Sequence, residues 1–92
     1  MALDRTMIRD LRGKAHQLHP VVMIASKGLT ENVMNEIELA LNTHELIKIR
    51  INDEEKQRQQ LTEEICAATR AELVQKIGKV VVLFRAKKAK TT

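Results

Sequence analysis

The residues in this chain best suited to chemistry are basic, and one of them lies in a short turn at residues 25–30. The turn has the sequence Ala-Ser-Lys-Gly-Leu-Thr and joins an apolar run to the expected start of a helix. Free backbone N–H groups and the helix dipole attract anions at such a start. Gly28 can adopt a positive φ angle, and Lys27 adds a mobile positive charge. The turn is therefore a candidate phosphate site, although a plain strand-to-helix turn with a solvated lysine has the same pattern.

A row of basic side chains follows the first expected helix. Its members recur at intervals of four, three and four residues: Arg5, Arg9, Arg12 and His16. At about 100° per residue they occupy a band about 60° wide, and we expect the apolar stripe of the helix on the opposite side. Guanidinium groups pair well with phosphate oxygens, so such a row suits a nucleic-acid backbone. The alternative is the ordinary polar face of an amphipathic helix.

Further basic residues belong to the expected strands. Lys48 and Arg50 alternate with three isoleucines, so one face of that strand is basic and the other apolar. Three more basic residues accompany the last two expected strands: Lys76, Lys79 and Arg85. These five residues form a candidate third basic surface, or simply the polar positions that a solvated sheet requires.

Aromatic side chains are nearly absent. The chain has no Tyr or Trp, and its single Phe, Phe84, is flanked by Leu83 and Arg85 and is expected in the core. RNA-recognition-motif and OB-type binders of single strands stack bases on exposed aromatic rings. The composition therefore favours binding through phosphate, sugar and shape, which suits folded RNA.

The sequence shows no constellation typical of catalysis. His16, His19 and His44 are scattered, and the close pair His16 and His19 lacks a third ligand. Cys66 lies in a mostly apolar helical segment and is expected to pack rather than attack a substrate. Phosphate-loop, dinucleotide and nucleophile-elbow motifs are absent from the sequence. We therefore expect no enzyme activity, no cofactor, no metal and no small-molecule substrate.

Length and charge restrict the class of protein. Ninety-two residues fit one domain, placed here at 1–87 and followed by a basic, flexible tail at 88–92. Residues 1–29 carry five basic and two acidic side chains. Residues 30–72 carry five basic and ten acidic side chains, and residues 73–92 carry six basic side chains and no acidic one. Such an uneven distribution of charge along the chain suggests that one side of the domain faces a polyanion. One cysteine and no apolar run of about 20 residues predict a cytoplasmic protein; we also expect a monomer.

Apolar periodicity and breakers divide the chain into seven elements. They are a helix at 3–19, a strand at 21–25, a helix at 31–43, a strand at 46–51, a helix after residue 52, and strands at 73–77 and 80–85. Thr30 is expected to cap the second helix and Asn52 the third, with Glu55 completing a capping box. The third helix is expected to bury three residues: Leu61, Ile65 and Ala68.

This order, α-β-α-β-α-β-β, predicts the fold class α/β (α+β). Strand–helix–strand units imply parallel pairing, and Gly78 with Lys79 closes an antiparallel hairpin. The result is a mixed four-stranded sheet packed by helices. The first strand is apolar throughout and is expected to be covered on both faces. We also expect the basic residues of the two chain ends to gather beside the start of the second helix.

The chain resembles the bacterial YhbY-type single CRM domain, named for chloroplast RNA splicing and ribosome maturation. The likeness runs from about residue 3 to residue 87 and is strongest in LRGKAHQLHPVVMIASKGLTENVMNEIELALNTHELIKIRI and AELVQKIGKVVVLFR. It implies a fold similar to the C-terminal domain of bacterial translation initiation factor three. It also implies association with precursors of the large ribosomal subunit.

The resemblance further implies a site. In the family a GxxG loop, like that of KH domains, is held to contact RNA, and it corresponds here to Ala25, Ser26, Lys27 and Gly28. The chain departs from the family at Ala25, where relatives carry Gly and where a positive φ angle would be strained. It departs again at Arg70, which replaces a common Gly between the third helix and the third strand. A left-handed conformation at Arg70 costs about 1 kcal/mol.

The sequence thus predicts an RNA-binding protein, a ribosome assembly factor that associates with large-subunit precursor RNA through the GxxG-like loop and basic surfaces. The alternative is a protein-binding module that docks on a ribosomal protein through its acidic central segment. Salt dependence of RNA binding favours the first hypothesis, and partners that survive RNA digestion favour the second. The RNA element and the assembly step are not encoded in any motif of the chain.

Overall fold

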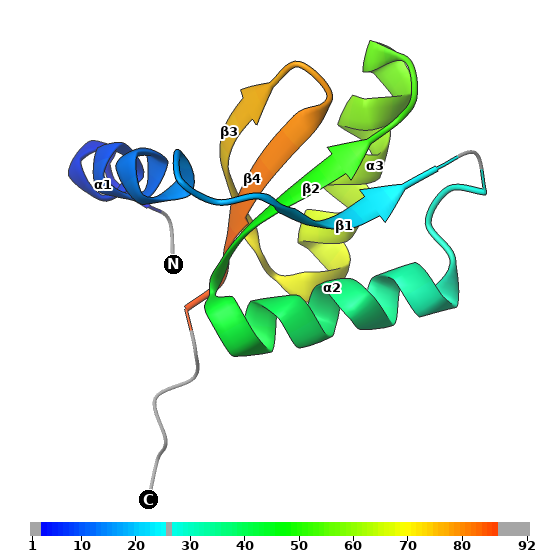
Figure 1. Ribbon diagram of the computed structural model, residues 1–92, viewed down its shortest axis with the longest axis horizontal. Coiled ribbons are helices and arrows are strands. Elements are labelled where there is room, and N and C mark those ends of the chain that lie inside the picture. Colours follow the sequence, from blue (N-terminus) through cyan, green and yellow to red (C-terminus); the bar gives the residue numbers. More distant parts are fainter. Residues whose placement is uncertain (1–2, 26, 87–92) are drawn as a thin grey trace, which may run out of the picture.

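The computed structural model describes residues 3–25 and 27–86 and contains, in that part of the chain, three helices and one four-stranded sheet (Figure 1). The elements are α1 (Arg5–Ala15), β1 (Pro20–Ile24), α2 (Glu31–His44), β2 (Leu46–Ile51), α3 (Glu55–Thr69), β3 (Glu72–Ile77) and β4 (Val80–Phe84). The predicted element order and fold class are confirmed. The predicted tail at 88–92 lies outside the described residues.

The sheet has the strand order β1-β2-β4-β3. β1 and β2 are parallel, as expected for strands joined by a crossover helix. β4 runs antiparallel to both β2 and β3 and separates them. The hairpin turn between β3 and β4 contains Gly78 at φ 56°, a conformation that glycine adopts without strain. The predicted mixed sheet is therefore confirmed, with its last strand inserted at the centre.

The two faces of the sheet are covered unequally. One face packs against α2 and α3 and buries the larger core, which includes Ile24, Ile49 and Leu83. The other face packs against α1 alone, through a smaller cluster built on Leu11 and Val82. Figure 1 shows α1 apart from the other two helices. Part of the sheet beside α1 is left open to solvent.

β1 is an edge strand, and the prediction that both of its faces are covered is wrong. Val22 and Ile24 are buried, whereas Val21 and Met23 are 50% and 58% exposed. α1 packs against β2 and β3 and leaves the second face of β1 uncovered. An apolar run is compatible with burial on one face or on two, and only the position of the neighbouring helix decides between them.

The start of α3 also differs from the prediction. Glu54, not Asn52, is the N-cap, and its side chain makes no capping hydrogen bond. The Asn52 side chain instead accepts a hydrogen bond from Arg50 Nε at 3.0 Å. Asn52 therefore belongs to the end of β2, and the predicted capping box with Glu55 does not form.

The buried face of α3 is more polar than predicted. Ile65 is fully buried, Leu61 is half-buried, and Ala68 is exposed. Thr62 and Thr69 take the remaining buried positions, and each hydroxyl donates to the carbonyl four residues earlier, at 2.7 Å. This bond satisfies the hydroxyl inside the core, so a threonine can occupy a position where the sequence suggested an apolar residue.

The C-terminal end of α3 stores backbone strain. Arg70 has φ 63° and ψ 20°, the left-handed conformation, and its N–H donates to Cys66 O. Because glycine adopts this conformation freely, we expect Arg70→Gly to raise the free energy of unfolding by about 1 kcal/mol. In a domain of this size that gain corresponds to about 4–8 °C in Tm. Urea titration of Arg70→Gly beside Arg70→Ala tests it, because alanine keeps the strain; equal stability of the two variants would contradict the prediction.

Candidate nucleic-acid interface

The loop at residues 25–30 leaves the C-terminal end of β1 and turns at Gly28. Gly28 has φ 72°, its N–H donates to Ala25 O at 2.9 Å, and its carbonyl accepts from Thr30 N at 3.1 Å. Among the described non-glycine residues only Glu45 and Arg70 have positive φ angles. Ala25 is therefore unstrained at the position where the family resemblance implies Gly. Ser26 lies outside the described residues.

The start of α2 is capped as predicted. Thr30 Oγ1 accepts a hydrogen bond from Val33 N at 3.2 Å, so one of the free amides at this helix end is already used. Glu31 places a negative charge in the first turn and opposes an anion there. Of the charges near this helix start, that of Lys27 is therefore the one suited to a phosphate.

The loop shares one end of the sheet with the hairpin. Asn52 N donates to Ile24 O at 2.9 Å, and Ile51 N donates to Lys79 O at 2.8 Å. The backbone of Lys79 is thus two strand spacings, about 10 Å, from the end of β1. Arg50 pairs across the sheet with Met23 at the same end. The structure therefore brings Lys27, Arg50 and Lys79 to neighbouring loops and strand ends.

The basic row of α1 flanks the buried stripe of the helix instead of lying opposite it. Arg12 Nε donates to Val74 O of β3 at 3.4 Å. The molecule is 40 Å long, and α1 begins at one end of that axis while the loop after β1 lies at the other (Figure 1). The prediction that Arg5 and Arg9 gather beside the start of α2 is therefore wrong. They lie at the far end of the same domain.

Basic side chains bridge the space between these two ends. Arg12 and His16 of α1 line a cavity of about 440 Å³ together with Lys48, Gln75 and Ile77 of the sheet. The basic positions therefore extend from α1, over the sheet face that carries Lys48 and Arg50, to the loop and the hairpin at the other end of the molecule. We name this set the basic track, and its members are Arg5, Arg9, Arg12, His16, Lys48, Arg50, Lys27 and Lys79.

The members of the basic track form no ion pairs within the described residues. Within the described residues the two ion pairs with N···O distances up to 4.0 Å are Lys14–Asp10 and Arg85–Glu38. Neither pair includes a member of the track. Its positive charges are therefore available to an anionic partner, the condition that an electrostatic nucleic-acid surface requires.

Arg85 and Lys76 do not join the track, so the predicted third basic surface is wrong for these two residues. Arg85 follows the opposite end of β4 from Lys79 and forms an ion pair with Glu38 of α2 at 3.0 Å. Lys76 is opposite Val81, a residue of the core under α2 and α3, and it lines a cavity with Glu55 and other residues of α3. The direction of β4 places Arg85 at the opposite end of the sheet, and the alternation of side chains along β3 places Lys76 on the opposite face.

The groups that resemble catalytic residues have structural surroundings. Cys66 is half-buried against the core, and burial, with a smaller contribution from the charge of Glu72, raises the pKa of its thiol. A raised pKa keeps the sulfur protonated and weakly nucleophilic. Among the described residues, no three His, Cys, Asp or Glu side chains are arranged to hold a metal ion. None of the described helices combines the length and apolarity needed to cross a bilayer.

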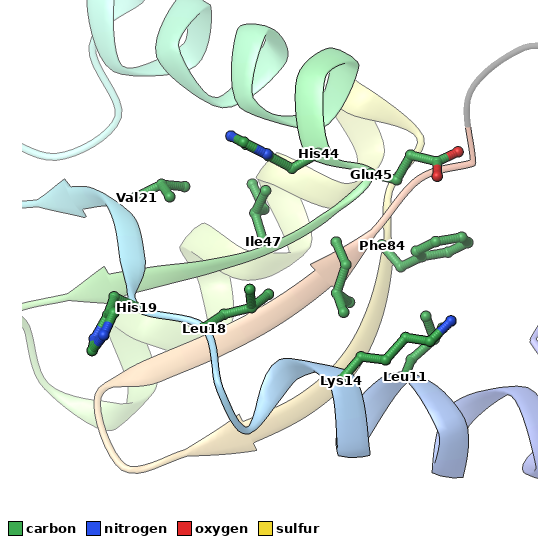
Figure 2. Close-up of a pocket in the computed structure, with 10 residues that line it drawn as sticks. Leu11, Lys14, Leu18, His19, Val21, His44, Glu45, Ile47 and Phe84 are labelled. Carbon is green, nitrogen blue, oxygen red and sulfur yellow. The ribbon is translucent and has the colours of Figure 1, made fainter.

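The other flank of α1 borders an apolar pocket of about 520 Å³ (Figure 2). Its apolar lining comes from Leu11, Leu18, Val21, Leu46, Ile47 and Phe84, and its charged or polar lining from Lys14, His19, His44 and Glu45. Phe84, the single aromatic residue of the chain, also packs against the cluster under α1. The two flanks of α1 therefore differ: one is mainly apolar and the other is basic.

Comparisons with known proteins identify relatives along most of the chain. The family model of the CRS1 / YhbY (CRM) domain matches residues 3–85. A Pseudomonas aeruginosa protein named a probable RNA-binding protein is 43% identical over 86 residues, covering 92% of this chain and 83% of its own. An RNA-binding protein of Haemophilus influenzae is 49% identical over 76 residues, which cover 82% of this chain and 77% of that protein. The solution structure of a hypothetical Staphylococcus aureus protein matches with a TM-score of 0.82 and 34% sequence identity. The match covers 98% of this chain and 95% of that protein.

Proposed function

The chain belongs to the CRS1 / YhbY (CRM) domain family, and from that premise we propose that it is an RNA-binding protein that assists assembly of the large ribosomal subunit. It binds precursor RNA of that subunit as a single domain, without catalytic chemistry of its own. The basic track is the contact surface. Lys27 is the member of the track nearest the start of α2, and we expect the GxxG-like segment of Ala25, Ser26, Lys27 and Gly28 to contact RNA there.

The observation that carries the proposal is that the eight basic residues of the track form no ion pair with an acidic side chain among the described residues. Acidic residues are frequent on α3, which packs against the opposite face of the sheet. Its first two turns are almost entirely exposed. We propose that this difference in charge between the two sides of the sheet turns the basic track toward a polyanion.

The chemistry of the track suits folded RNA. Arginine and lysine contact phosphate oxygens, and such contacts position a protein without reading bases. The single aromatic ring is packed beside α1, so stacking of bases on exposed aromatic rings is not the main source of affinity. The spacing of charges along an axis of 40 Å lets the domain recognise an extended stretch of RNA backbone.

We expect the affinity for large-subunit RNA to fall steeply with salt. If five side chains of the track each neutralise one phosphate, the slope of log K against log salt is about −4.5 on duplex RNA. Fluorescence anisotropy between about 50 and 200 mM salt measures this slope. A slope near zero would contradict electrostatic binding by the track.

Sedimentation tests the cellular partner. On a sucrose gradient of cell extract, the protein is expected to migrate with precursors of the large subunit and to return to the top after RNA digestion. Co-migration with small-subunit particles alone would overturn the assignment. A protein partner that remains bound after digestion, and is lost when the exposed acidic residues of α3 are neutralised, would support docking through the acidic segment instead.

A further inference from the structure

The cavity between α1 and the open sheet face has the features of a site for one unpaired nucleotide. It has a volume of about 440 Å³, within the range of about 300–1000 Å³ common for small-ligand pockets. Its lining contains Arg12, His16 and Lys48 and no carboxylate. A nucleotide carries a phosphate and a planar base, and the cavity offers chemistry for both.

The cavity contains two planar groups that can stack on a base. Proteins that bind unpaired RNA bases stack them on aromatic rings, on His, or on the guanidinium plane of Arg. Phe84 lines the apolar pocket on the other flank of α1, so it is unavailable here. Arg12 and His16 are one helical turn apart and line the cavity together. They are the stacking groups of this surface.

The Arg12 side chain reaches the sheet through one hydrogen bond of 3.4 Å in the absence of a ligand. Its Nε donates to Val74 O of β3, and within the described part of the chain that carbonyl is the one partner recorded for the guanidinium. The two terminal nitrogens are thus left for a phosphate or a base edge.

The sheet supplies the remaining contacts. Lys48 brings a second positive charge, Gln75 brings an amide that can donate to and accept from a base edge, and Ile77 brings apolar surface that is 50% exposed. Gln75 follows a bulge in β3, which places Val74 in the core under α1 while Gln75 lines the cavity. An acidic peptide would use the two cations but not the stacking planes or the amide.

We propose that this cavity, lined by Arg12, His16, Lys48, Gln75 and Ile77, binds a single unpaired nucleotide that protrudes from folded RNA. The inference rests on the proposed function and deepens it, because it names the RNA feature that the domain prefers. The basic track holds the flanking backbone, and the cavity distinguishes a bulged helix from a continuous one.

The test compares two RNA hairpins that differ by one bulged nucleotide. The full chain is expected to bind the bulged hairpin about 10-fold more tightly, an effect typical of stacking one base. Arg12→Lys keeps the charge and removes the planar group, so this variant should bind the bulged and the continuous hairpin equally. Arg9→Lys, the same change on the same helix outside the cavity, should keep the preference. Gln75→Ala should reduce it without altering any charge.

Several outcomes would overturn the inference. Equal binding of the two hairpins by the unaltered chain does so, as does equal behaviour of Arg12→Lys and Arg9→Lys. Displacement of both hairpins by polyglutamate at one concentration would show that the cavity recognises negative charge alone. Tight binding of both hairpins with no preference leaves the proposed RNA-binding function standing, whereas failure to bind either hairpin removes both proposals.

Discussion

Replacing Lys27 and Lys79 together by glutamate is expected to weaken binding to large-subunit RNA by about 100-fold at moderate salt. The two residues lie on neighbouring loops at one end of the sheet, and neither has a carboxylate partner among the described residues. A hydrogen bond to a charged group contributes about 1.5 kcal/mol at least, so two lost phosphate contacts amount to about 3 kcal/mol and a 100-fold change. The slope of log K against log salt should also become shallower by about 1.8.

A matched variant separates contact from overall charge. Lys14→Glu with Lys56→Glu changes the net charge by the same amount, and neither residue belongs to the basic track. We expect this pair to weaken binding by less than 10-fold, because only the long-range attraction is reduced. Both double variants alter exposed side chains, so their thermal melts should stay close to the parent. Equal loss of affinity in the two would show that the track is not the contact surface.

Arg85→Met is expected to lower the free energy of unfolding by about 2–3 kcal/mol. The guanidinium connects the end of β4 to α2 and α3. On α2 it donates to the Glu38 carboxylate at 3.0 and 3.1 Å and to Asn42 Oδ1 at 2.8 Å, and at the end of α3 it donates to Thr69 O at 2.9 Å. Removing one member of a fully buried ion pair costs about 3–5 kcal/mol. The cost here is lower because the Arg85 and Glu38 side chains are 20% and 40% exposed. Urea titration measures this loss, and Tm should fall by about 8–24 °C.

The partner residue provides the control for Arg85. If the cost comes from leaving Glu38 unpaired, the double variant Arg85→Met with Glu38→Gln should recover about 1 kcal/mol relative to Arg85→Met alone. Because Arg85 lies outside the basic track, affinity for RNA measured well below the melting temperature should not change. A large loss of affinity with little loss of stability would return Arg85 to the RNA surface and contradict the structural assignment.

Local features of the sequence were enough to predict the elements. Thr30 caps α2, alternation between Leu46 and Ile51 marks β2, and Gly78 turns the final hairpin. Each of these signals depends on residues within about four positions of one another, where propensity and periodicity act. The capping box at Asn52 failed at the same range, because its side chain bonds Arg50 instead.

Predictions about which side chains share a surface depend on contacts between residues far apart in the sequence. Composition and spacing picked out the basic residues as candidates, yet they could not decide which of these residues share a surface. Arg85 is 47 positions from Glu38, and Arg12 is 62 positions from Val74. Contacts at such separations depend on how the elements pack, and no local pattern encodes them.

The sequence by itself determined the order of helices and strands, the apolar and basic faces of β2 and the family of the chain. Only the tertiary structure decided that β4 lies between β2 and β3, that β1 is an open edge, and that α1 covers part of one sheet face. Hydrophobic burial specifies which side of an element turns inward but is not directional between elements. The packing of α1 across the sheet therefore forms the cavity, because it brings Arg12 and His16 beside Lys48.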